Sequence, residues 1–208
     1  MKNFWRLLPT PFFTLAPMAD VTDAAFRKMI AKYSAHERAD GTKGGPDVMW
    51  TEFVAADGLV LATKAGQEKL LADLIYHKEE RPIVAQLFSS HEDNMEKASS
   101  LCLQLGFDGI DINMGCPVKK VIKAGAGAIL MKNPDPIARI VEAVKKAVKI
   151  PVTLKIRSGW THSSINAVQI AKIAEACGAD AITVHARTAD QGYSGQADWK
   201  IIAEVKKH

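Results

Sequence analysis

Six short, largely apolar segments alternate along this chain with segments of helical periodicity. The clearest helical pattern runs over residues 165–177, where apolar residues recur about every 3.6 positions. A repeated strand–helix order predicts a parallel sheet and hence an α/β fold. The expected strands span residues 12–18, 48–53, 83–88, 109–113, 152–157 and 181–185, and the expected helices span 23–33, 66–76, 92–105, 136–148, 165–177 and 198–207.

Helix caps fix several of these boundaries. Thr22 or Asp23 is expected to begin one helix, Ser90 or His91 another, and glycines at 106 and 178 to follow helix ends. The first strand, 12–18, is expected to be buried. The polar segment 35–46 carries no motif and is expected to form an exposed, mobile loop.

Composition narrows the function classes. With 208 residues, 48% hydrophobic and 24% charged, the chain suits one globular domain. A net charge of +4 permits a nucleic-acid partner without requiring one. The three cysteines have neither metal-type nor disulfide-type spacing, which favours a reducing cytoplasm and no metal. No run is apolar and long enough to cross a bilayer, and Pro9 and Pro11 interrupt the N-terminal one, so no membrane association is expected.

Residues 110–117, Ile-Asp-Ile-Asn-Met-Gly-Cys-Pro, place Cys116 on a glycine turn after an alternating strand. A thiol at the end of a strand is well placed for chemistry. The segment after it, 118–128, is first basic and then glycine-rich, which favours an anionic substrate. The octet alone leaves a second reading open, because cysteines in such loops are often buried and inert.

Four consecutive strands place a polar side chain at or near their carboxyl ends: Gln86, Asn113, Lys155 and His185. Alternation puts apolar residues on the opposite face of each strand, where helices can cover them. Ligand sites of α/β proteins form at the carboxyl ends of parallel strands. Lys155 on an inward face needs a partner that accepts or balances its charge, such as a phosphate or the N1–C2=O edge of a flavin.

The chain resembles the tRNA-dihydrouridine synthases over nearly its whole length. The resemblance is carried by five motifs in the family's order, of which Asn-Met-Gly-Cys-Pro followed by paired lysines is the most specific. They are Ala-Pro-Met-Ala-Asp-Val-Thr-Asp (16–23), Ile-Asn-Met-Gly-Cys-Pro-Val-Lys-Lys-Val (112–121), Gly-Ala-Gly-Ala (125–128), Pro-Val-Thr-Leu-Lys-Ile-Arg-Ser-Gly-Trp (151–160) and Ile-Thr-Val-His-Ala-Arg-Thr (182–188).

This resemblance implies a TIM barrel that binds FMN and reduces the C5–C6 bond of uridines in tRNA, with NADPH as the reductant. It assigns Cys116 as the general acid. A thiol with an ordinary pKa near 8.5 is mostly protonated at neutral pH and suits that role. The resemblance further implies FMN contacts from Pro17, Met18, Ala19, Gln86, Lys155 and His185, and substrate contacts from Asn113, Lys119, Lys120 and Arg187.

The sequence also departs from the family. Asp20 and Ala186 stand where members often have glycine. A complete barrel has eight strands and about 250 residues, whereas six strands are counted here. Residues 1–208 are therefore expected to form a partial FMN-binding barrel domain, without the last two strands and the C-terminal helical domain.

Two other functions remain open at this stage. A flavin barrel of the dihydroorotate dehydrogenase type would share the fold and the lysine but act on a small pyrimidine. A non-catalytic remnant would bind tRNA or a partner without turnover. Lys119 and Lys120, directly after the Cys-Pro pair, favour RNA over a small acid.

Overall fold

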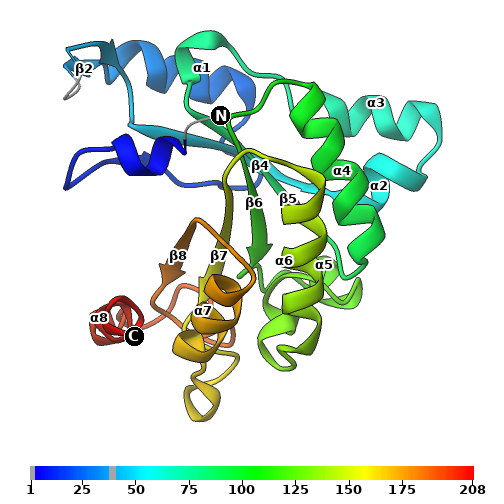
Figure 1. The fold of residues 1–208 in the computed structure, drawn as a ribbon, viewed down its shortest axis with the longest axis vertical. Helices are drawn as coiled ribbons and strands as arrows, with labels where there is room; N and C mark the ends of the chain where they lie inside the picture. Colours follow the sequence, from blue (N-terminus) through cyan, green and yellow to red (C-terminus); the bar gives the residue numbers. More distant parts are fainter. Residues whose placement is uncertain (1–2, 38–40) are drawn as a thin grey trace.

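The structure is a computed structural model that describes residues 3–37 and 41–208. Its main feature is a six-stranded parallel sheet with the order β1-β4-β5-β6-β7-β8. The strands are β1 (Thr14–Leu15), β4 (Val48–Ala55), β5 (Ile83–Phe88), β6 (Gly109–Met114), β7 (Val152–Arg157) and β8 (Ala181–His185). The curved sheet, with helices between successive strands, confirms the expected incomplete α/β barrel (Figure 1).

Helices connect the strands close to the expected positions. The α-helices are α1 (Ala24–Tyr33), α2 (Ala56–Leu61), α3 (Lys64–Ala72), α4 (Glu92–Gln104), α5 (Lys119–Lys123), α6 (Asp135–Ala147), α7 (Ala167–Ala176) and α8 (Trp199–Lys207). Short 3₁₀ helices are η1 (Phe4–Leu7), η2 (Lys78–Glu80), η3 (Gly127–Met131) and η4 (His162–Ser164). Asp23 and His91 are the N-cap residues of α1 and α4, and Gly106 and Gly178 both have φ +84°, so the predicted caps are confirmed.

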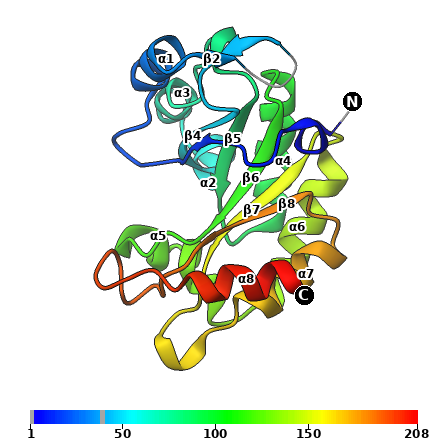
Figure 2. The same ribbon diagram turned by 90° about the vertical axis from the view of Figure 1, so that its left-hand side faces the viewer.

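The helix predicted over 66–76 is α3, which begins earlier and ends at Ala72. Its N-cap is Thr63, whose hydroxyl accepts from Gly66 N. The two short helices α2 and α5 were not predicted. Figure 2 shows α8 lying beside α7 at the β8 end of the sheet.

The prediction that 12–18 is a buried strand is also wrong. Only Thr14 and Leu15 pair, with Val48 and Met49, and the side chain of Phe13 is 70% exposed. Prolines at 11 and 17 lack the N–H that a ladder needs. Because β1 is an edge strand with one neighbour, the sheet covers only one side of it.

The polar segment 35–46 is more ordered than a loop at its ends. β2 (His36–Glu37) pairs antiparallel with β3 (Lys43–Gly44), and the side chains of His36, Glu37 and Lys43 are exposed. Residues 38–40 of the predicted loop lie outside the described residues. None of the described helices is both long enough and apolar enough to span a membrane.

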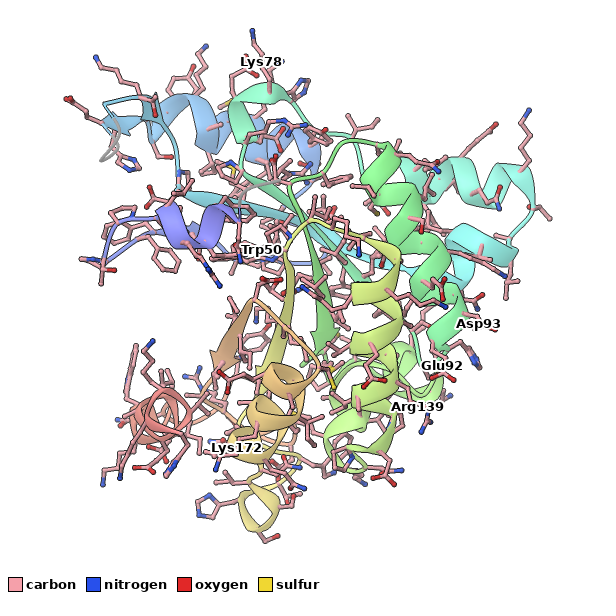
Figure 3. The ribbon with its side chains drawn as sticks, in the orientation of Figure 1. Trp50, Lys78, Glu92, Asp93, Arg139 and Lys172 are labelled. Atoms are coloured by element: carbon pink, nitrogen blue, oxygen red, sulfur yellow. The ribbon has the colours of Figure 1, made fainter. Side chains whose placement is uncertain are left out.

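The two faces of the sheet differ in polarity. The face covered by α4, α6 and α7 carries the core, which includes Leu87, Ile112 and Leu154 at 0% exposure. On the concave face, Phe4, Trp5 and Leu8 pack against Val48, Trp50 and Val84, near the amino ends of the strands (Figure 3 labels Trp50). The polar side chains of the concave face lie further along the strands, toward their carboxyl ends.

A buried ion pair joins α1 to η2, the 3₁₀ helix that precedes β5. Arg27 Nε lies 2.6 Å from Glu80 Oε2, and both side chains are fully buried. Arg27 also donates to the carbonyls of Thr22 and Ile75, and Glu80 accepts from His77 N. Removing one partner would leave an uncompensated buried charge.

We expect Arg27→Met to lower the free energy of unfolding by about 3–5 kcal/mol, because Glu80 would lose its partner in a dry site. Urea denaturation followed by circular dichroism would measure it. The matched control is Arg139→Ala, which breaks an exposed pair with Glu92 between α6 and α4 (Figure 3) and should cost about 0–1 kcal/mol. Equal losses for both variants would contradict the expectation.

Candidate functional site

A cleft of about 530 Å³ opens at the carboxyl ends of the strands. It is lined by the β1–α1 loop, by the ends of β4 to β8, and by the turn after β6. The lining residues are Pro17, Met18, Ala19, Asp20, Val21, Phe53, Gln86, Asn113, Gly115, Cys116, Pro117, Val118, Lys155, Arg157, His185 and Tyr193. A larger hollow of about 630 Å³ lies between α7, β8 and α8 and contains none of these residues.

The structure therefore brings most of the predicted site residues together. The three residues of the β1–α1 loop, Cys116 and the four strand-end side chains all line the cleft. Lys119 and Lys120 do not; they are exposed on α5, directly after the lining residues Pro117 and Val118. Arg187 does not line the cleft either, but its Nη1 is 3.2 Å from Nε2 of His185, which does.

The floor of the cleft is a chain of buried side-chain hydrogen bonds. Asn113 Nδ2 donates to Gln86 Oε1 at 3.0 Å, and Gln86 Nε2 donates to Asp111 Oδ2 at 2.6 Å. The Thr153 hydroxyl donates to the other oxygen of Asp111. Burial raises the pKa of the Asp111 carboxyl to about 6, although Thr153, Gln86 and the charge of Lys155 lower it. Because this pKa lies below 7, most of the Asp111 carboxyl is ionised at neutral pH.

The turn that carries Cys116 is held from two sides. Asn113 Oδ1 accepts from Gly115 N at 3.1 Å and from Cys116 N at 2.9 Å. On the other side, Cys116 O accepts from Ala128 N at 3.0 Å. Gly127 has φ +65°, and a Cβ there would lie 2.6 Å from Cys116 O, so this close approach requires glycine.

The thiol is a neutral group in this environment. Burial raises the pKa of Cys116, while the N–H of Val118 and the charges of Arg157 and Lys155 lower it by less. A raised pKa keeps the proton on sulfur at pH 7 and below. The site therefore presents a proton donor rather than a thiolate nucleophile.

Lys155 carries the charge that faces the ligand space. Its Nζ makes no hydrogen bond or ion pair with the described residues, and burial lowers the pKa of its amine. Asp111 opposes that shift from below. An inward-facing lysine was expected to need a group that balances its charge, and Asp111 supplies part of that balance within the protein. The N–H donors of the Lys155 ammonium remain available to a ligand.

Arg157 was not among the predicted site residues. Its side chain is buried and links two segments: Nε donates to Gly115 O at 2.8 Å, and Nη1 donates to the carbonyls of Thr188 and Gly192. The alternation along β7 places it on the same face as Lys155, and that pattern could have identified it. Tyr193, 82% exposed in the loop after β8, also lines the cleft, and no strand pattern points to it.

His185 is neutral. Burial, Arg157, Lys155 and Arg187, in that order, lower the pKa of its imidazole to about 4. Its ring centroid lies 5.9 Å from that of Tyr193. At neutral pH the ring thus offers a hydrogen-bond acceptor to Arg187 without adding a further positive charge.

The cleft as a whole suits an acceptor-rich or anionic ligand and a reaction that needs a proton. It combines amide donors, one ammonium, one guanidinium and a protonated thiol above the buried carboxylate of Asp111, and the exposed carboxylate of Asp20 also lines it. Within the described residues, no cluster of three or more His, Cys, Asp or Glu side chains could hold a metal ion.

Comparison with known proteins agrees with this geometry. A family model described as dihydrouridine synthase (Dus) matches residues 14–208. A "probable tRNA-dihydrouridine synthase" of Rhodobacter capsulatus is 40% identical over 94% of this chain and 56% of its own length. A protein of the same name from Rhizobium leguminosarum is 42% identical over 93% of this chain and 56% of its own length. "tRNA-dihydrouridine synthase B" of Pasteurella multocida is 38% identical over 93% of this chain and 54% of its own length.

The chain thus spans about half the length of the curated relatives that it matches. The family match covers almost the whole chain, including every strand of the main sheet and every residue that lines the cleft. The chain belongs to the dihydrouridine synthase family.

Proposed function

We propose that this chain forms the catalytic cleft of a tRNA-dihydrouridine synthase that binds FMN, uses NADPH as reductant and acts in the cytoplasm. The observation that carries the proposal is the protonated thiol of Cys116 on a fixed turn, beside the donor-rich floor of the cleft. Reduction of the C5–C6 bond of uridine needs one hydride and one proton. The protein itself has to supply only the proton.

The residues of the cleft fit a flavin. Gln86 and Lys155 would donate to the ring edge that accepts hydrogen bonds, and Pro17, Met18 and Ala19 would line the ring. His185 would face the ring or its phosphate tail as a neutral group. When bound, FMN would supply the hydride for C6 of the uracil, and NADPH would reduce the oxidised flavin again.

Cys116 would donate the proton to C5 of the uracil. Its raised pKa favours the thiol, and the two hydrogen bonds from the turn to Asn113 hold the backbone that carries it. A general acid must be protonated when the reaction begins. Turnover is therefore expected to fall as the pH rises through the pKa of this thiol.

Binding of tRNA would use the cationic residues next to the cleft. Lys119 and Lys120 are exposed at the start of α5, one turn from the thiol-bearing segment, and can meet phosphates. Arg187 would contribute through its charge and through its contact with His185, and Asn113 would contact the target uridine. This exposed basic segment favours RNA over a free pyrimidine as the substrate.

The first test is Cys116→Ala in active enzyme that carries this sequence. FMN binding and flavin reduction by NADPH should be unchanged, whereas dihydrouridine formation in tRNA should slow at least about 100-fold, the scale of a lost general acid. The matched control is Cys177→Ala, the half-buried cysteine that ends α7. Normal dihydrouridine formation by Cys116→Ala would refute the assigned role.

The second test is Lys155→Ala. Loss of a charged donor should weaken FMN affinity at least about tenfold and slow flavin reduction. Flavin fluorescence titration and stopped-flow absorbance would measure the two effects. Lys120→Ala should instead weaken tRNA binding alone and make it less dependent on salt. If Lys155→Ala keeps FMN and loses only tRNA affinity, Lys155 is an RNA contact.

A further inference from the structure

Asp111 is a buried carboxylate that the proposed reaction does not use. It lies in the middle of β6, is 0% exposed and does not line the cleft. Its oxygens accept from Gln86 and Thr153, which come from the two neighbouring strands, β5 and β7. A buried charge is costly unless its hydrogen bonds serve the structure or the site around it.

An ionised carboxylate only accepts hydrogen bonds, and this fixes the direction of each amide above it. Gln86 has to turn its nitrogen toward Asp111, so its oxygen accepts from Asn113. The nitrogen of Asn113 is then committed to Gln86, and its oxygen accepts the backbone N–H groups of Gly115 and Cys116. Backbone N–H groups only donate. The carboxylate at one end and the N–H groups at the other therefore require the same orientation of the Gln86 and Asn113 amides.

We propose that Asp111 is a positioning residue that orients the Gln86 and Asn113 amides and thereby holds the Cys116 turn in place. The relay runs Asp111, Gln86, Asn113, Cys116, with 2.6, 3.0 and 2.9 Å between the bonded atoms. Each amide nitrogen keeps one further N–H. The floor of the cleft thus offers donors, together with the Lys155 ammonium, to a ligand edge that accepts.

The charge of Asp111 has a second effect. It raises the pKa of Lys155 more than any other group does, and it thus favours the protonated amine against the effect of burial. Donors of this kind suit a ring edge with carbonyl and imine acceptors, and this choice of ligand class rests on the proposed function. The hold on the Cys116 turn does not depend on which ligand binds.

The experiment measures alkylation of Cys116 by iodoacetamide in the 208-residue chain, without flavin or RNA. Peptide mass spectrometry separates Cys116 from Cys177, which serves as the internal reference. Asp111→Ala removes the first link, and we expect Cys116 to react about tenfold faster, the equivalent of one lost buried hydrogen-bond partner. The rate at Cys177 should not change.

Two variants separate this role from a loss of packing or charge. Thr153→Val removes a donor to the same carboxylate but leaves the relay, and its alkylation rate should stay within about twofold of wild type. Asp111→Asn removes the charge, yet its oxygen can still accept from Gln86 while its nitrogen donates to the Thr153 hydroxyl. It should therefore restore the wild-type rate.

Gln86→Leu breaks the middle link without altering Asp111. We expect it to accelerate alkylation as Asp111→Ala does, and the double variant to be no faster than either single one. If circular dichroism shows that Asp111→Ala does not fold, the alkylation rate of Gln86→Leu alone tests the proposal. Unchanged alkylation in the folded relay variants, or equal acceleration in Thr153→Val, would overturn the proposal. Because no flavin or tRNA is present, a missing synthase activity would leave these results unaffected.

Discussion

The alternation of side chains along parallel strands governs this molecule, because the central strands β5, β6 and β7 each face two environments at once. On one face, residues such as Ile112 and Leu154 are buried beneath helices and supply the hydrophobic core. On the other, Asp111, Asn113 and Lys155 come from positions that directly alternate with them. A shift in register by one residue would exchange the two sets, so the polar set also helps to define the pairing.

A polar interior of this kind is stable only if its groups are satisfied. The relay from Asp111 to Cys116 satisfies the buried carboxylate and the two amides. The guanidinium of Arg157 is satisfied separately, because it donates to three backbone carbonyls. Gln86 and Asn113 each keep one N–H for a ligand, and Lys155 keeps all of its donors. The amino ends of the strands are instead closed by Trp5 and its neighbours. The cleft therefore opens only where the polar side chains gather, at the carboxyl ends.

Much of this arrangement could be predicted from the sequence. The strands from β4 to β8 and the convergence of Gln86, Asn113, Lys155 and His185 follow from period-two patterns in apolar runs, which are strong local signals. The features that the sequence did not predict depend on contacts between residues far apart in the chain. The apolar run before Pro17 resembled a buried strand, but an edge position leaves it exposed. The bonds of Arg157 reach the loop after β8, and the orientation of Gln86 depends on Asp111 across the sheet; sequence spacing reports neither.

The chemistry of Cys116 depends on which of two opposing effects is larger. Cationic neighbours, Arg157 and Lys155, favour a thiolate, as they do in enzymes that use cysteine as a nucleophile. Burial acts against them and is the larger effect, so the pKa of the thiol is raised. The same cations that would activate a nucleophile elsewhere are partly engaged here, Arg157 with carbonyls and Lys155 with the field of Asp111. The same cleft thus combines cationic groups that suit an electron-rich ligand with a thiol that keeps its proton. The proposed reduction of the uracil C5–C6 bond needs that proton, because hydride added at C6 leaves negative charge at C5 that must be protonated.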